Sequence, residues 1–229
     1  MGRTRVHGDA TATALLEAAE RLAEAEGVDA LTVRRVADQV GVTTRAVYST
    51  FGSKDGLLAA LGVRTFDMLA TAVRRVRVTD DPAADLVRVG AGAFRNFACR
   101  HPGLFRVGFA SLATPPGVWA EVAPANLHAW SALVARVERL AEVGQLGRRT
   151  IVAAATEFHC LCEGLAVNEL RGNLGSARAA APLWRDSLTA LVAGWSVGGT
   201  ERNGECPTAP ASADHTLKRN STTSPSAIT

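Results

Sequence analysis

The stretch TVRRVADQVGVTTRAVYSTFGSKDGLL, residues 32–58, decides the fold of this chain. A helix-turn-helix needs a small residue where its two helices cross, a glycine in the turn, and a branched apolar residue facing back from the second helix. Ala37, Gly41 and Val47 supply these three features in that order. Because glycine adopts the left-handed conformation without steric cost, Gly41 marks the turn. The stretch therefore predicts two short helices that cross at Ala37.

The second of these helices carries polar side chains suited to reading bases. Thr43 is expected to cap it, so that its first turn exposes Thr44 and Arg45 to the major groove of DNA. Arg45 can donate two parallel hydrogen bonds to guanine O6 and N7, a contact worth about 1–3 kcal/mol of discrimination. The two threonines can reach bases or phosphates.

Other polar residues of the stretch are suited to holding the DNA backbone. Thr32 begins a helix, whose free N–H groups and dipole attract phosphate, and Tyr48 and Lys54 can each reach a phosphate. Between residues 30 and 54, four basic residues face one acid, a balance of 4 − 1 = +3. We therefore expect DNA contacts from Thr32, Arg34, Thr43, Thr44, Arg45, Tyr48 and Lys54. Arg3 and Arg5 would lie on a terminal arm that is either frayed or able to enter the minor groove.

Composition narrows the class of protein further. The 229 residues carry a net charge of +3, so the overall charge points to neither nucleic acid nor membrane. The 47% hydrophobic content excludes global disorder, and four cysteines form no disulfide framework in a chain this long. Glu17, Glu20 and Arg21 interrupt the apolar run of a secretion signal, and no charge-free apolar stretch approaches the ~20 residues of a membrane span. We expect a cytoplasmic protein.

The chain up to about residue 195 shows helical periodicity and no sustained alternation of period two. We expect an all-α protein of about nine helices, with a three-helix helix-turn-helix domain before a C-terminal helical bundle. Thr11 or Thr13 would begin the first helix, and later helices are expected over 124–143, 148–172 and 176–195. The predicted parts are a flexible arm over 1–10, the helix-turn-helix domain with its connecting fourth helix over 11–76, a second helical domain over 77–195, and a disordered tail over 196–229, which is rich in Gly, Ser, Thr and Pro.

The stretch from about Leu15 to Leu58 resembles the N-terminal domain of TetR-type (TetR/AcrR) transcriptional regulators. The resemblance rests on Thr32-Val33, Val36-Ala37, Gly41-Val42-Thr43, Val47-Tyr48, Phe51, Ser53-Lys54-Asp55 and Leu57-Leu58. It implies DNA contacts from Thr32, Thr43, Thr44, Arg45, Tyr48 and Lys54. It also implies a homodimer that binds double-stranded operator DNA, most simply a repressor released by a small-molecule effector. The fourth helix would then link the effector cavity to the DNA-reading helices.

The segment RNFACRHPGLFRVGFAS, residues 95–111, resembles the helix, His-Pro-Gly break and short helix of the TetR branch with a WHG-type C-terminal domain. In that branch a later helix carries Trp and, four residues on, His-Gly. Here His159 stands for the Trp and Glu163 for the His, whereas Gly164 fits. The departure leaves the expected fold intact, but it removes the basis for assigning the pocket chemistry of that branch to this chain.

The resemblance places an effector site and a dimer interface in the second domain. Aromatic residues gather there, either to line a cavity between helices or simply to fill the core. His159 and Glu163 share a helix face, as an internal pair or as the polar part of a pocket. The expected lining is Phe94, Phe97, Phe105, Phe109, Trp119, Trp130, Phe158, His159, Cys162 and Glu163. The last two helices would pair two subunits, one of them through Leu183, Trp184, Leu188, Leu191 and Trp195.

Other motifs fail on geometry. The run GWSVG, residues 194–198, matches G-x-S-x-G, but a helix rather than a strand precedes Ser196. The His, Cys and Glu side chains within 159–163 cannot all reach one metal ion from one helix. No Arg or Lys within a helical turn activates Cys160 or Cys162 for redox sensing. We expect no catalytic residue, metal or cofactor; a helical carrier or enzyme with a vestigial DNA-binding head is the alternative.

Overall fold

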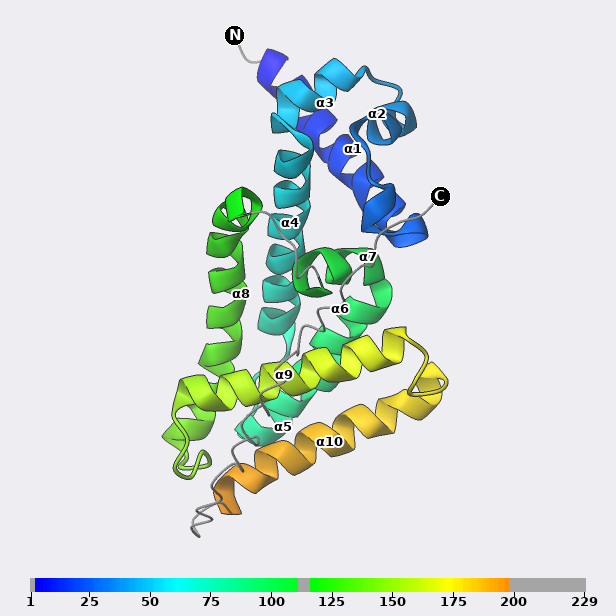
Figure 1. The fold of residues 1–229 in the computed structure, drawn as a ribbon. Coiled ribbons are helices and arrows are strands. Elements are labelled where there is room, and N and C mark those ends of the chain that lie inside the picture. Colours follow the sequence, from blue (N-terminus) through cyan, green and yellow to red (C-terminus); the bar gives the residue numbers. More distant parts are fainter. Residues whose placement is uncertain (1–2, 111–115, 198–229) are drawn as a thin grey trace, which may run out of the picture. The chain divides into compact units, whose positions relative to one another are not determined.

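The computed structural model describes residues 3–110 and 116–197, and these residues are helical without a β-strand (Figure 1). When Pro82–Arg100 and Pro102–Ala110 are each counted as one continuous helix, the described residues form nine α- or π-helical stretches. The predicted all-α class, with a helix-turn-helix domain followed by a helical bundle, is confirmed.

The first three helices form the predicted helix-turn-helix domain. They are α1 (Arg3–Glu26), α2 (Val33–Val40) and α3 (Thr44–Phe51), with a 3-10 turn at Val28–Ala30. Ala37 on α2 and Val47 on α3 are fully buried, as expected where two helices cross. Gly41 has φ 74° and ends α2 in the left-handed conformation. A residue with a Cβ would be strained there.

Side-chain caps fix where the short helices start. The side chains of Thr32, Thr43 and Ser53 each accept a hydrogen bond from the backbone N–H three residues on, at 3.3, 3.3 and 2.9 Å. They begin α2, α3 and α4 (Lys54–Arg75). Each cap satisfies an N–H group that the helix itself leaves free, worth about 1 kcal/mol. Local sequence therefore determines where α3 and its two neighbouring helices begin.

The connecting helix α4 packs along α8 (Pro116–Glu142), and the two lie side by side in Figure 1. Gly62 permits this approach, because a Cβ there would lie 2.7 Å from a methyl carbon of Val122. Among the described residues, α4 is the one helix whose length and apolar composition would allow a membrane span. Half of its apolar window is buried inside the protein. The apolar character of α4 is thus that of a core helix.

The C-terminal end of α4 is held by arginines from α8. Nη2 of Arg136 donates to the carbonyl oxygens of Val73, Arg74 and Val76 at 2.9, 3.2 and 2.7 Å. A helix end leaves its last carbonyls short of partners, and among the described residues only Val73 of these three also accepts a backbone hydrogen bond, from the N–H of Val76 at 3.3 Å. Nearby, the buried Asp85 accepts hydrogen bonds from Thr79, Arg139 and Arg88. Burial opposes ionisation of Asp85, but these hydrogen bonds hold the pKa of its carboxyl well below the usual value.

The second half of the chain surrounds the α4–α8 pair. Its elements are α5 (Pro82–Arg88), η2 (Val89–Phe94), α6 (Arg95–Arg100), α7 (Pro102–Phe105), η3 (Arg106–Ala110), α9 (Ile151–Leu170) and α10 (Ala177–Val197). The two segments η2 and η3 are π-helices, which the sequence analysis did not anticipate. In proteins, π-helical turns are rare and often mark functional sites.

Three helix boundaries differ from the prediction. α1 begins at Arg3, not at Thr11 or Thr13, so residues 3–10 are helical. No proline interrupts this segment, and the glycine within it costs only about 1 kcal/mol. α8 begins at Pro116 and contains Pro124, which the sequence analysis placed at the helix start. α10 runs to Val197, and the rest of the predicted tail lies outside the described residues.

The expected dimer-forming side chains of α10 require a correction. Trp184, Leu188 and Trp195 are fully buried inside the protomer, while Leu183 is 42% exposed. The indole N–H groups of Trp184 and Trp195 donate to Glu169 and Glu157 on α9, at 2.7 and 2.8 Å. An indole that finds both apolar surroundings and a polar partner within its own chain is a core residue. These three side chains hold α10 to its own protomer.

Candidate functional site

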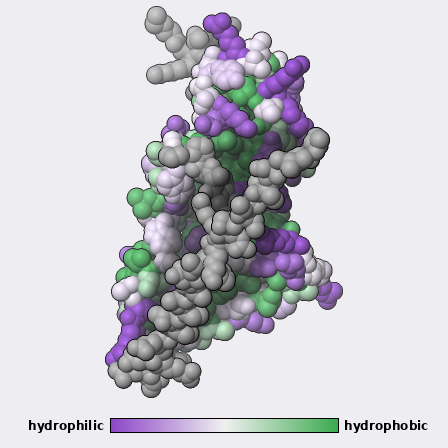
Figure 2. Space-filling view, in the orientation of Figure 1, coloured by the Kyte–Doolittle hydropathy of each residue, from purple (hydrophilic) through white to green (hydrophobic). Residues whose placement is uncertain are grey.

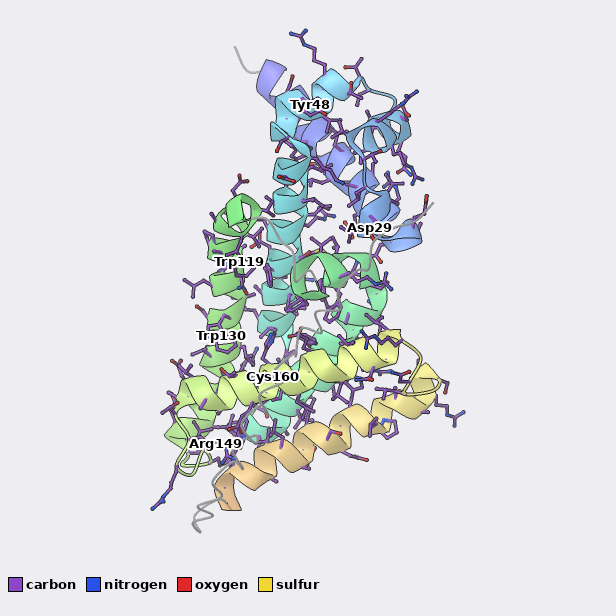
Figure 3. All side chains as sticks on the ribbon, viewed as in Figure 1. Asp29, Tyr48, Trp119, Trp130, Arg149 and Cys160 are labelled. Carbon is purple, nitrogen blue, oxygen red and sulfur yellow. The ribbon has the colours of Figure 1, made fainter. Side chains whose placement is uncertain are left out.

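An exposed polar face on α3 forms the candidate DNA-binding surface. Thr44, Arg45 and Tyr48 are exposed, whereas Val47, on the opposite side of the same helix, is fully buried. Tyr48 is 51% exposed, and Figure 3 shows it on α3 at the end of the molecule that carries the helix-turn-helix. Figure 2 shows hydrophilic residues on this domain, with pale and hydrophobic residues between them. Thr44 and Arg45 thus face outward and Val47 faces inward, as the sequence predicts.

The remaining predicted DNA contacts are also exposed. Thr32 and Thr43 use their side-chain oxygen to cap α2 and α3, and each hydroxyl can still donate its own hydrogen to a phosphate. Lys54 is exposed at the first position of α4. Arg34 is 87% exposed and lies 3.9 Å from Asp38, a surface pair that contributes little. All seven predicted residues thus lie on the surface of the helix-turn-helix.

Arg35, a neighbouring cation, has a different role. Its guanidinium donates to both oxygens of Glu26 at the end of α1, one of them at 2.8 Å. Its hydrogen bond lowers the pKa of Glu26, and the reciprocal bond raises the pKa of Arg35. Arg35 therefore ties α2 to α1, and its charge is less available to DNA than that of Arg34 or Arg45.

A small, partly open cavity of about 60 Å³ lies among α4, η2, η3, α8 and α9. Six of the predicted ligand-binding residues line it: Phe94, Phe109, Trp130, Phe158, His159 and Cys162. Further lining residues that the sequence analysis missed are Phe66, Leu69, Val73, Val89, Asn126, Ala129 and Leu133. Those on α4 and α8 face each other across the helix pair, a contact between distant segments that periodicity alone does not show.

Four predicted residues lie elsewhere. Phe105 is buried behind the cavity, stacked on Phe109 with ring centroids 5.0 Å apart. Phe97 is buried against His101. Trp119 is 45% exposed, and Figure 3 shows it on α8 well before Trp130. Glu163 is not among the lining residues, but its carboxylate lies 3.5 Å from His159 Nε2.

His159 and Asn126 are the polar members of the cavity lining. Rings of Phe94, Phe109 and Trp130 surround the imidazole, with centroids 6.0, 5.8 and 6.0 Å away. Burial lowers the pKa of His159, and the nearby Glu163 carboxylate offsets only part of that effect. The imidazole is therefore neutral at pH 7 and offers one donor and one acceptor inside an aromatic cage.

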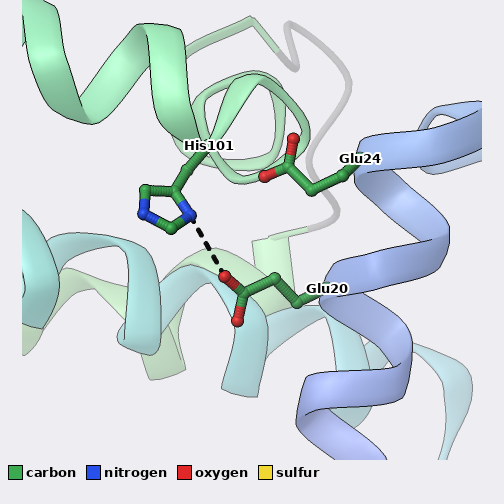
Figure 4. Close-up of side chains that lie close together, drawn as sticks. All are labelled: Glu20, Glu24 and His101. Atoms are coloured by element: carbon green, nitrogen blue, oxygen red, sulfur yellow. Dashed lines mark ion pairs between the residues drawn. The ribbon is translucent and has the colours of Figure 1, made fainter.

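A close interlock joins α1 to the segment behind the cavity (Figure 4). Glu24 accepts hydrogen bonds from the backbone N–H groups of Gly103 and Leu104, at 2.8 and 3.4 Å, and so caps α7. A Cβ on Gly103 would lie 2.5 Å from the carbonyl carbon of Ala23. Only glycine allows α7 to approach α1 this closely.

Within the same interlock, Glu20 lies 3.2 Å from His101 Nδ1 and accepts a hydrogen bond from Arg64 at 2.8 Å. Among the described residues, Glu20, Glu24 and His101 are the one group whose His, Cys or carboxylate atoms converge closely enough for a metal ion. Their carboxylates already serve Arg64, His101 and the start of α7. The arrangement is that of a domain contact.

The other residues considered for chemistry are placed as follows. Cys162 is buried, and burial raises the pKa of its thiol far above the usual value, which makes it inert. Cys160 is exposed on α9 and so points away from the cavity (Figure 3). The hydroxyl of Ser196 donates to the carbonyl of Gln145 at 3.3 Å, on a helix and without a strand before it.

Comparisons with known proteins agree with this arrangement. Residues 15–61 match the model of the family "bacterial regulatory proteins, tetR family", and residues 87–191 match that of "tetracyclin repressor-like, C-terminal domain". An uncharacterised HTH-type transcriptional regulator from Mycobacterium tuberculosis is 34% identical over 94 residues. That match covers 40% of this chain and 41% of the relative.

Solved structures share the fold over most of the chain. A protein from Rhodococcus sp. RHA1 has a TM-score of 0.71 at 24% identity, covering 81% of this chain and 95% of that one. A tetR-family regulatory protein from Rhodococcus RHA1 has a TM-score of 0.64 at 21% identity, covering 79% and 96%. Bacillus subtilis FadR, solved in complex with stearoyl-CoA, has a TM-score of 0.65 at 13% identity, covering 82% and 99%. With the helix-turn-helix built as described, the chain belongs to the TetR family of bacterial regulatory proteins.

Proposed function

We propose that the protein is a homodimeric, cytoplasmic repressor that binds operator DNA through α3 and releases it when a small molecule occupies the cavity. The observation that carries this proposal is the exposed face of Thr44, Arg45 and Tyr48 on a helix locked from behind by Val47. A helix held in this way can enter the major groove with its polar side chains toward the base edges. DNA contact by the seven predicted residues remains a prediction.

The dimer interface is best supported on the exposed face of α9. Ala153, Thr156, Cys160 and Gly164 recur there at three- and four-residue spacing, opposite the buried face of Ala155, Phe158 and Cys162. A Cβ added at Gly164 meets nothing within 4 Å in the protomer. Such small side chains would let a partner helix pack closely, and exposed Leu183 on α10 would extend the contact.

The cavity favours an apolar effector with one hydrogen-bonding group. Phenylalanine, tryptophan and aliphatic side chains dominate its lining, while neutral His159 and Asn126 supply the polar atoms. Its volume of about 60 Å³ is smaller than the about 300–1,000 Å³ of typical ligand sites. Entry of an effector would therefore have to displace side chains, and Phe109 on η3 is a wall residue directly joined to α7.

Displacement of η3 offers a physical route to the DNA-binding domain. Phe109 of η3 lines the cavity. The segment directly before η3 in the chain is α7, which Glu24 of α1 caps. An effector that moves η3 would thus move α7 and, through this cap, α1. DNA affinity would fall by the effector's differential affinity for the two arrangements.

The proposal is tested by fluorescence anisotropy with labelled fragments from upstream of the protein's own gene. We expect salt-sensitive binding to one fragment that is tighter than binding to shuffled DNA of equal length. Arg45→Ala should reduce that preference, whereas Arg148→Ala, which removes an exposed arginine outside the helix-turn-helix, should leave it unchanged. Equal affinity for specific and shuffled fragments would instead favour a carrier or enzyme with a vestigial head.

A further inference from the structure

A second, open groove of about 860 Å³ lies on the other side of the cavity wall. It runs between the C-terminal half of α4, the α5–η2–α6 stretch and α10. Val89 and Phe94 of η2 face the small cavity, whereas Ala91, Gly92 and Ala93 face the groove. A Cβ added at Gly92 would meet nothing within 4 Å, so this part of the floor is open. The groove has the size of a small-molecule site.

Six arginines line this groove, and no carboxylate is among the described residues that line it. Two of them are neutralised: Arg88 pairs with Asp85, and Arg95 pairs with Glu169 at 2.6 Å. The other four make no ion pair or side-chain hydrogen bond with described residues: Arg75, Arg77, Arg100 and Arg185. They come from the end of α4, the residues just after it, α6 and α10, which are far apart in the sequence.

Four unneutralised cations around one concavity repel one another, and an anion between them removes that repulsion. Guanidinium groups bind phosphate through two parallel hydrogen bonds, which makes arginine the residue best suited to this ligand. DNA is a less suitable occupant. Arg75 lies at the opposite end of α4 from Lys54, about 30 Å away at 1.5 Å per residue.

We propose that this groove binds a small molecule with two or more phosphate groups, such as a nucleoside diphosphate. The free arginines hold the phosphates, and the apolar floor around Gly92 receives the rest of the molecule. This inference goes beyond operator and effector binding and does not depend on either. A failure to bind DNA would therefore leave it standing, and the reverse also holds.

Isothermal titration calorimetry of the full chain with ADP tests the proposal, at about 50 mM salt so that screening is weak. We expect saturable binding, which Arg75→Gln and Arg185→Gln each weaken about tenfold or more. Arg148→Gln removes an exposed arginine far from the groove in sequence and should leave the affinity within about twofold. Gly92→Leu fills the floor without changing the charge and should also weaken ADP binding.

Inorganic pyrophosphate and orthophosphate serve as further probes. Pyrophosphate binding that depends on Arg75 and Arg185, with much weaker orthophosphate binding, supports a site that reads paired phosphates. The proposal is overturned if neither ADP nor pyrophosphate binds at about 1 mM, or if Arg148→Gln weakens binding as much as the groove variants. It is also overturned if the groove variants weaken DNA binding but not ADP binding, since the arginines would then serve DNA. Circular dichroism of each variant checks the fold.

Discussion

Arg45 and Lys54 are both exposed cations of the helix-turn-helix, but they present their charge in different ways. Arg45 lies in the first turn of α3, where a planar guanidinium can read a guanine edge, whereas Lys54 begins α4 as a point charge. Arg45→Ala should cost about 1–3 kcal/mol of discrimination at one base position. Lys54→Ala should weaken binding to all sequences and reduce the salt slope by about one unit. Anisotropy titrations over single-base operator variants and several salt concentrations separate the two.

His159 should make stability depend on pH. Its folded-state pKa lies below 6.5, because burial disfavours the imidazolium. In the unfolded chain the imidazole has its ordinary pKa of about 6.5. Between the folded and the unfolded pKa the unfolded chain binds more protons than the folded protein, so stability falls as the pH is lowered through about 6.5. The free energy of unfolding, measured in urea from about pH 7.5 to 5.5, should decrease in the wild type.

His159→Gln should flatten this dependence, because glutamine does not titrate. The matched control is His128→Gln, which removes an exposed histidine from α8 that lies outside the cavity, 3.9 Å from the exposed Asp67. An unchanged slope in His159→Gln would show that another group causes the effect. The lowered pKa values of Asp85 and Glu169 act at more acidic pH and do not interfere.

At the scale of single residues, exposure on α3 was predictable and the cavity lining was predictable only in part. α3 is short, its start is fixed by a cap and its buried residue is Val47, so helical periodicity determines which of its residues face outward. Phe97 and Trp119 are aromatic, as many lining residues are, but Phe97 packs against His101 and Trp119 is exposed. Asn126 was missed because its role depends on which face of α8 meets α9, and one helix in isolation does not carry that information.

At the scale of elements, the contact between α1 and α7 depends on one glycine. Gly103→Ala would place a Cβ 2.5 Å from the backbone of Ala23, and neither backbone can move without separating the helices. We expect a loss of about 1–3 kcal/mol in unfolding free energy, as for other overpacked sites. Urea denaturation should show no such loss for Gly117→Ala, where a Cβ meets nothing within 4 Å. Similar stability of the two variants would contradict the tight interlock.

The sequence predicted helix boundaries well where a capping or helix-breaking residue sets them. It predicted them poorly where packing against other helices decides how far a helix extends. Thr32, Gly41, Thr43 and Ser53 act through their own backbone neighbours, so their effect is visible in sequence. Pro124 within α8 shows the limit of such rules. The π-helical turns of η2 and η3 lie where aromatic side chains from five elements, α4, η2, η3, α8 and α9, meet around one cavity, and no local signal in the sequence specifies that meeting.

At the scale of the whole molecule, dimerisation should depend on the exposed face of α9. Gly164→Glu places a charge on that face without a clash inside the protomer. If α9 packs on a partner helix, the variant should be monomeric by analytical ultracentrifugation at micromolar concentration. It should also lose operator binding, because two linked recognition helices are needed to read successive major grooves.

The control for this experiment is Ala135→Glu, which adds the same charge to an exposed position of α8. It should remain dimeric and bind the operator. A Gly164→Glu variant that stays dimeric would move the interface elsewhere. Of the side chains that the sequence predicts at the interface on α10, Trp184 and Trp195 belong to the core instead, because their apolar and polar groups are both satisfied within the protomer.

The π-helical turn η2 separates two compartments with one strip of backbone. A π-turn amounts to a single extra residue inserted into an α-helix, so deleting one residue near Gly92 would restore regular α-helical register. The wide turn absorbs the extra residue, so its removal would leave Val89 and Phe94 four residues apart and still on one helix face. The cavity wall would therefore keep its register, and the floor of the arginine groove, formed by Ala91, Gly92 and Ala93, would lose a residue. A one-codon deletion here would thus alter the groove and leave the cavity face of η2 in place.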